Sequence, residues 1–200
     1  TIQLAIQSRQ SSISIQIWKE YTDQIEISII NPSGVRVGPV PEILGPHRFR
    51  IGQTEILLYY GEPSPYSISQ EIYIDLLPVE SYLTEGIWRI VLSAGKIVTG
   101  QYEMWLPSDN VLKRGTGFLF PTDATTLTIP SSASRAISVG AYDARTFAYA
   151  DFSGRGFTRL TNMVKPGLVA PGVEVMTTTV GGGYVAFTET SFATPFVTGS

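Results

Sequence analysis

The sequence predicts a mainly β protein, in which an antiparallel β-sandwich of the jelly-roll form is followed by part of a larger α/β domain. Of its 200 residues, 43% are hydrophobic and 16% are charged, which is enough apolar content for a sizeable core and too little charge for a disordered chain. Polar and apolar residues alternate up to residue 118 and no longer do so beyond it. We therefore expect one domain over residues 1–118 and a second over residues 119–200.

The strands of the first domain are predicted from period-two alternation, which places apolar side chains on one face and polar ones on the other. Residues 11–18 and 24–29 show it most clearly. The other candidate strands are residues 55–60, 70–77, 86–92 and 96–105. Turn-forming residues separate these runs at 31–34, 61–65 and 93–95. The spacing corresponds to roughly eight strands, which is typical of a two-sheet sandwich.

The second domain contains short apolar runs without strict alternation, at residues 136–141 and 168–170. Such runs are typical of strands that are covered on both faces, as in a parallel sheet. Parallel strands need crossover helices, and about 80 residues leave little room for them. The chain also has no initiator methionine. We therefore expect it to be a piece of a longer protein that supplies the rest of the α/β domain.

Composition excludes several classes of partner and cofactor. The net charge is −3 and the isoelectric point is near 5.2, so we expect neither nucleic acid nor an anionic membrane as a partner. Without cysteine the chain has no disulfide and no thiolate metal site. Its histidine and acidic residues lack the spacing of metal ligands, and we expect no metal or cofactor.

The candidate active site lies in residues 188–199. Gly181, Gly182 and Gly183 predict a tight turn before a β-prone segment, and Thr190 or Ser191 can cap a following helix. A serine at this place lies over free backbone amides and the positive end of the helix dipole, which favour negative charge on a bound carbonyl oxygen. The alternative interpretation is that Ser191 is only a helix cap.

Four segments resemble motifs of the subtilisin-like serine proteases, and they occur in the order found in that family. Residues 190–199 resemble the nucleophile motif, with Phe192 where the family usually has methionine. The other three segments are residues 165–173, which resemble the family's Lys-Pro-Asp…Ala-Pro-Gly stretch, residues 129–143, and residues 152–156. The resemblance covers residues 121–200.

This resemblance implies that Ser191 attacks the carbonyl of a peptide bond, while a histidine takes its proton and an aspartate orients that histidine. Subtilases have the chain order Asp, His, Ser, so we expect both partners upstream of Thr1 and an inactive isolated chain. Thr190 and Glu189 would lie beside the reacting groups, and Gly182 and Gly183 would border the substrate. The resemblance also implies a cis peptide bond between residues 129 and 130, and it allows for calcium bound by backbone carbonyls.

A sandwich that precedes these motifs resembles the insertion in the clostridial Csp-type germination proteases. The resemblance implies a bacterial protein that is spore-associated or extracellular, with peptide or protein substrates. It further implies that the remainder of the subtilase catalytic domain is a partner of this chain. The sandwich would clamp that domain and slow its unfolding.

Two other functions stay open. Glu189 stands where the family has glycine, and this can mark a catalytically degraded pseudoprotease whose jelly roll binds a partner or signal. Alternatively, the sandwich is a carbohydrate-binding module that uses Trp18, Trp88 and Trp105, although tryptophans in alternating strands more often belong to a core. Four further residues carry expectations of their own: His47 as a loop or surface histidine, and Asp123, Asp143 and Asp151 as local caps.

Overall fold

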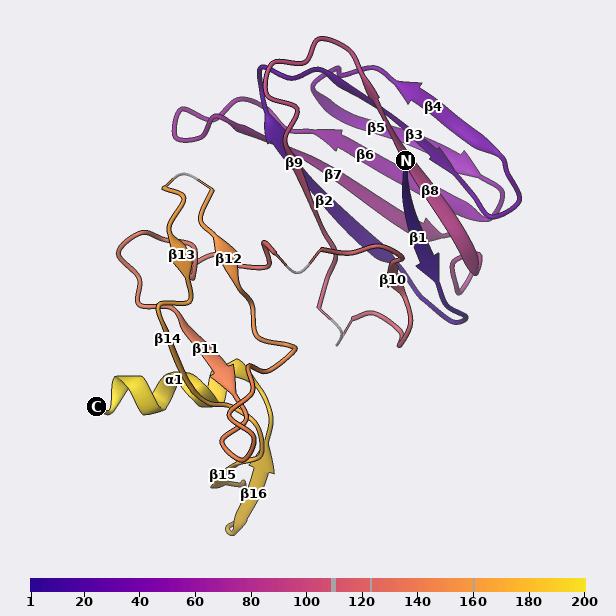
Figure 1. The fold of residues 1–200 in the computed structure, drawn as a ribbon. Coiled ribbons are helices and arrows are strands. Elements are labelled where there is room, and N and C mark those ends of the chain that lie inside the picture. The colour runs from indigo at the N-terminus through magenta and orange to yellow at the C-terminus, as the bar shows by residue number, and fades with distance from the viewer. Residues whose placement is uncertain (109–110, 123, 160) are drawn as a thin grey trace. The chain divides into compact units, whose positions relative to one another are not determined.

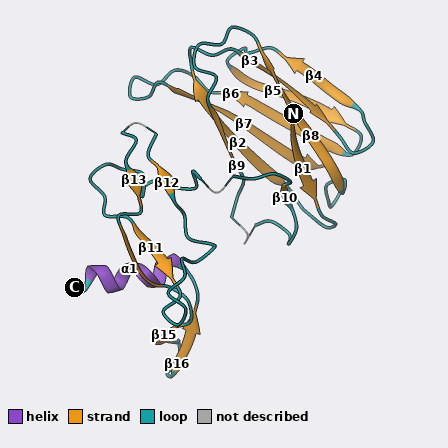
Figure 2. Ribbon diagram, in the orientation of Figure 1, coloured by secondary structure: helices purple, strands orange, loops and turns teal. Residues whose placement is uncertain are grey.

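The computed structural model describes residues 1–108, 111–122, 124–159 and 161–200. Contacts within the chain divide it into two compact units, Thr1–Phe120 and Pro121–Ser200. Strands are the main secondary structure of the described part, which has one α-helix, as Figures 1 and 2 show, and this confirms the predicted mainly β fold. Among the described residues, no helix has the length and apolar character needed to cross a membrane.

Two five-stranded antiparallel sheets form the first unit. The sheet with the order β10-β1-β8-β3-β4 consists of β1 (Ile2–Ile6), β3 (Ile25–Ile30), β4 (Arg36–Val40), β8 (Gly86–Ala94) and β10 (Gly117–Phe118). The sheet with the order β5-β6-β7-β2-β9 consists of β2 (Ile13–Glu20), β5 (Gly45–Ile51), β6 (Thr54–Tyr60), β7 (Ser69–Pro78) and β9 (Tyr102–Trp105).

The core of this unit is built from the inward side chains of both sheets, because alternation turns every second residue toward the other sheet. In β2, for example, Ile13, Ile15 and Ile17 are buried while Gln16 is exposed. Trp88 of β8 is 1% exposed and belongs to the same cluster. The core interpretation of the tryptophans is thus confirmed for Trp88, whereas the other two are half-buried.

The sequence did not predict β4 and β5. Both are edge strands. β4 contains Gly38 and Pro39 and does not alternate in burial, whereas β5 alternates but begins with Gly45 and Pro46, residues that usually mark a turn. The predicted strand over residues 96–105 is also shorter, because only Tyr102–Trp105 is extended in the sheet. Asp23 accepts hydrogen bonds from the amides of residues 98, 99 and 100, which holds that stretch as a loop.

In its described residues, the second unit contains three two-stranded sheets and helix α1 (Thr190–Thr198). Strand β11 (Val139–Tyr142) is parallel to β14 (Leu168–Pro171), which confirms the parallel pairing predicted for these two runs. The remaining strands pair antiparallel: β12 (Gly156–Phe157) with β13 (Val164–Lys165), and β15 (Val175–Thr178) with β16 (Tyr184–Phe187). The bond between Ile129 and Pro130 is cis, as expected.

A buried lysine organises the segment before β11. Lys165 is 5% exposed, and its Nζ donates hydrogen bonds to the carbonyl oxygens of residues 131, 133 and 136, at 3.1, 2.5 and 2.7 Å. Three carbonyl acceptors offset the cost of burying the ammonium group. This explains why the first residues of the predicted run at 136–141 are not in a strand.

Candidate active site

Ser191 is the second residue of α1 and is exposed. The residue that precedes the helix is Glu189, with extended backbone angles (φ −166°, ψ 161°), and no side chain caps the helix. The expectation that Thr190 or Ser191 is the cap is therefore wrong, because both already belong to the first turn. A serine in the first turn directs its hydroxyl to solvent and leaves backbone amides free for another acceptor.

Small side chains fix α1 against the parallel strands. Ala193 is fully buried and packs with Ala141 of β11 and Ala170 of β14. Gly172, which follows β14, donates its amide to the carbonyl of Tyr142, and the Glu189 amide donates to the carbonyl of Gly172, both at 3.0 Å. The start of the helix is thus held by main-chain bonds, and its position does not depend on flexible side chains.

Gly172 has a structural role that its sequence pattern alone does not reveal. A Cβ atom at Gly172 would lie 2.5 Å from the Cβ atom of Ala141 and 3.1 Å from the carbonyl oxygen of Glu189. Only glycine therefore allows this close approach of β11, β14 and the residue before α1. The signal for it in the sequence is the glycine of the Ala-Pro-Gly stretch.

The electrostatics around Ser191 have two opposing parts. Free amides and the helix dipole make the start of α1 electropositive. The carboxylate of Glu189 counters this, because the Ser191 hydroxyl donates a long hydrogen bond of 3.4 Å to its Oε2. Among the described residues, the carboxylate of Glu189 is the acceptor that the Ser191 hydroxyl reaches. The structure thus brings Glu189 and Ser191 together, as the sequence order implied.

Thr190 and the two glycines Gly182 and Gly183 were also predicted to lie near the reacting groups. Thr190 is half-buried, and its carbonyl oxygen accepts a hydrogen bond from the Thr194 hydroxyl.

Gly182 and Gly183 form the tip of the β15–β16 hairpin with φ of +94° each, a conformation that favours glycine. In Figure 1 this tip is the end of the hairpin away from α1, so the structure does not bring these glycines beside Ser191. Phe187 stacks on Phe192 at 5.0 Å between ring centroids and joins the near end of the hairpin to the helix.

The histidine of the chain, expected in a loop or at the surface, lies in an edge strand. His47 lies in β5 and is half-buried, with its Nε2 atom 2.8 Å from the carbonyl oxygen of Ile43 and its ring stacked on Phe49. Half-buried and exposed residues alternate along β5, but the strand begins with Gly45 and Pro46, which usually mark a turn in a sequence. The His47 imidazole thus has its hydrogen-bond and ring contacts within the sandwich.

Two of the aspartates predicted as local caps, Asp143 and Asp151, lie among the described residues. Asp143 accepts a hydrogen bond from the amide of Arg145, and this bond lowers the pKa of the carboxyl. Its expected role as a local cap is therefore confirmed. Asp151 is exposed in a turn, and Asp123 lies outside the described residues. In the described part of the chain, no three histidine or acidic residues come together to hold a metal ion.

Comparisons with known proteins show the family of this chain. The model of the subtilase family matches residues 85–200, more than half of the chain. The chain therefore belongs to the subtilase family. Among solved structures it is similar to the CspB protease of Clostridium perfringens, with a TM-score of 0.89 and 31% sequence identity. The match covers 99% of this chain and 41% of that one, and no curated protein matches.

Proposed function

We propose that this chain is the C-terminal part of the catalytic domain of a serine endopeptidase, with Ser191 as its nucleophile. The observation that carries the proposal is the exposed hydroxyl of Ser191 in the first turn of α1, in a chain of the subtilase family. Similarity to a structure described as a protease supports the same reaction. The sandwich of residues 1–118 is proposed to be an inserted jelly-roll domain that stabilises the catalytic domain.

In the proposed reaction, the oxygen of Ser191 attacks the carbonyl carbon of the scissile peptide bond. A histidine outside residues 1–200 takes the hydroxyl proton and later gives it to the leaving amine, and an aspartate there orients the imidazole. The backbone amide of Ser191 and the electropositive start of α1 stabilise the oxyanion. The isolated chain is then inactive, because a serine without its base is a poor nucleophile.

The test uses the full-length protein and a fluorophosphonate probe, which labels activated serines covalently. We expect labelling of the natural protein and none of Ser191→Ala. Ser200→Ala is the matched control, because it removes an exposed hydroxyl just beyond the other end of α1. Labelling that persists in Ser191→Ala would exclude this residue as the nucleophile.

A pseudoprotease is the second candidate, and the contact between Glu189 and Ser191 favours it. The Glu189 carboxylate accepts a hydrogen bond from the Ser191 hydroxyl. It therefore competes with the catalytic histidine, which must accept a hydrogen bond from the same hydroxyl. If this competition has abolished catalysis, the natural protein stays unlabelled and Glu189→Gly restores labelling. Labelling of the natural protein at a rate similar to that of Glu189→Gly excludes the pseudoprotease.

A further inference from the structure

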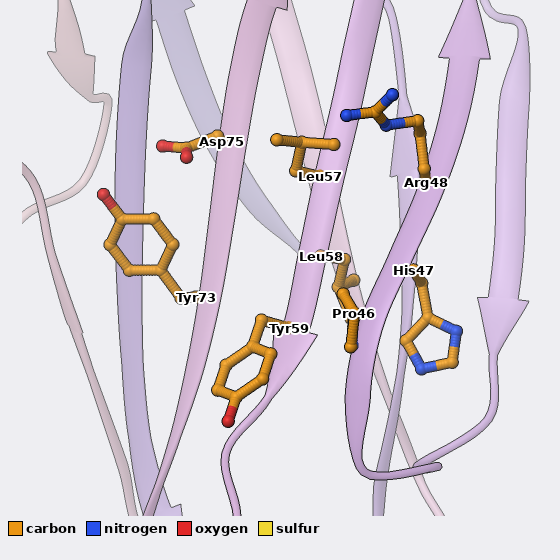
Figure 3. Close-up of a pocket in the computed structure, with 8 residues that line it drawn as sticks. All are labelled: Pro46, His47, Arg48, Leu57, Leu58, Tyr59, Tyr73 and Asp75. Carbon is orange, nitrogen blue, oxygen red and sulfur yellow. The ribbon is translucent and has the colours of Figure 1, made fainter.

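A pocket of about 490 Å³ lies on the sandwich, on the sheet that contains β5, β6 and β7. Figure 3 shows the residues that line it, which are Pro46, His47, Arg48, Leu57, Leu58, Tyr59, Tyr73 and Asp75. All of them belong to the first unit. None was singled out as a ligand-binding residue by the sequence, because they come from three strands that the turns separate.

Strand register arranges six of these residues in two rows across the sheet. One row contains Pro46, Tyr59 and Tyr73, which are directly opposite one another on β5, β6 and β7. The other contains Arg48, Leu57 and Asp75. Residues between these positions, such as Leu58 and Ile74, are buried in the core, so both rows lie on the outer face of the sheet.

Asp75 is the unusual residue of this pocket. Its side chain is half-buried, and none of the described residues forms an ion pair with it. Burial raises the pKa of Asp75, because the carboxylate loses hydration, while a hydrogen bond from Tyr73 partly opposes the shift. Figure 3 shows the Tyr73 hydroxyl and the Asp75 carboxylate on the same side of β7. Asp75 thus has no counter-ion among the described residues, and its carboxylate lies on the same side of β7 as the Tyr73 side chain.

The cationic residue of the pocket does not supply that counter-ion. Arg48 forms an ion pair with Glu55 at 3.1 Å and is largely exposed. It is also two strands away from Asp75, which corresponds to about 10 Å at the usual strand spacing. His47 is engaged with the carbonyl of Ile43. The acidic side of the pocket is thus open to a cation from outside.

The same face continues as an acidic and aromatic surface over β7, β2 and β9. Eleven outward positions of these strands are all described, and none is lysine or arginine. They are Ser69, Glu71, Tyr73, Asp75 and Leu77 on β7, Ser14, Gln16, Trp18 and Glu20 on β2, and Glu103 and Trp105 on β9. Carboxylates next to aromatic rings are the groups that attract ammonium and guanidinium ions.

We propose that this pocket binds a lysine or arginine side chain of a basic peptide. The aliphatic stem of that side chain packs against Leu57 and Tyr59, and its charged end meets the Asp75 carboxylate and the Tyr73 ring. Further basic residues of the peptide lie over the acidic surface of β7, β2 and β9. Charge selects this partner over a neutral glycan, because the outward positions of β7, β2 and β9 offer carboxylate acceptors and contain no lysine or arginine.

The test titrates the 200-residue chain with a fluorescein-labelled hexapeptide of alternating arginine and serine. Its matched probe has citrulline in place of each arginine, which removes the charge and keeps the shape. We expect saturable binding of the arginine peptide and binding of the citrulline peptide weaker by about tenfold or more. Amide chemical shifts should change at β6 and β7. Asp75→Asn should weaken binding by a similar factor, and Asp151→Asn, the same change in the other unit, should not alter it.

Three outcomes would overturn the proposal. Equal affinity for the two peptides would show that charge is not recognised, and unaltered binding by a folded Asp75→Asn would show that the pocket is not the site. Free arginine that binds as tightly as the peptide would identify a small-molecule site instead of a peptide site. Chemical shifts at the same residues with a neutral oligosaccharide, without a response to the arginine peptide, would identify a glycan-binding face.

Discussion

The amide of Glu189 donates a hydrogen bond of 3.0 Å to the carbonyl oxygen of Gly172 and so joins the end of β14 to the start of α1. This bond fixes where the helix begins, and with it the position of the Ser191 hydroxyl. The contact is possible because the residue after Pro171 has no side chain. The parallel strands therefore position the candidate nucleophile directly through the main chain.

Gly172→Ala should displace the start of α1. The added Cβ atom would meet the Cβ atom of Ala141 at 2.5 Å, and overpacking of this kind costs about 1–3 kcal/mol. We expect a lower melting temperature, and slower fluorophosphonate labelling if the full-length protein is active. Gly167→Ala is the control, because a Cβ atom there meets nothing within 4 Å. Equal effects of the two substitutions would contradict this role of Gly172.

Ala193→Leu should destabilise the second unit. Ala193 is 0% exposed among other alanines, so a larger side chain has no space and pushes α1 away from β11 and β14. The expected loss is about 1–3 kcal/mol in the free energy of unfolding, measured by denaturant titration. Ala186→Leu makes the same change at an exposed position of β16 and should have little effect.

Lys165→Met should loosen the segment of residues 131–136. Methionine fills a similar volume but cannot donate to the three carbonyl oxygens. The carbonyls of residues 131 and 133 keep a second donor, from the Ser138 hydroxyl and the amide of residue 136. The carbonyl of residue 136 loses the donor that Lys165 gives it, and an acceptor left unpaired costs about 1–3 kcal/mol. Faster hydrogen exchange in this segment, together with a lower melting temperature, would show the loss. Lys96→Met, at an exposed position of the sandwich, is the control. Unchanged exchange in Lys165→Met would argue against the lysine as the organising group.

Asp23 should make the stability of the sandwich depend on acid pH. Hydrogen bonds from the amides of Thr99, Val98 and Gly100 lower the pKa of the Asp23 carboxyl in the folded chain. A lowered folded pKa gives stabilisation that is present above the unfolded value, about 3.9, and is lost as the pH falls through the folded value. Asp23→Asn should therefore reduce the difference in stability between neutral and acid pH.

The measurement for Asp23 is urea unfolding at a series of pH values from neutral to strongly acid. Asp151→Asn changes the same group at an exposed turn and serves as the reference. A pH profile of Asp23→Asn that is parallel to that of the natural chain would show that these amides do not hold the charge.

The sequence by itself determined the strands in which buried and solvent-exposed positions alternate regularly. Alternation identified β2, β3, β6 and β7, because each has one face in the core and one in solvent. The order of four motifs identified the family and the nucleophile candidate. It also indicated the cis bond at Ile129–Pro130, since that proline belongs to the same motif pattern.

The tertiary structure decided what depends on contacts between distant segments. β4 and β5 became strands because a neighbouring strand offered hydrogen bonds, although Gly38 and Pro39 in β4 and Gly45 and Pro46 in β5 are residues typical of turns. The rows that contain Tyr73 and Asp75 exist only through strand register. The role of Gly172 likewise depends on how near β11 and the residue before α1 approach it. The alternation of polar and apolar residues reflects the solvent exposure of one segment and can be read from that segment alone. Strand register and the close approach of two backbones depend on pairs of segments that are distant in the sequence.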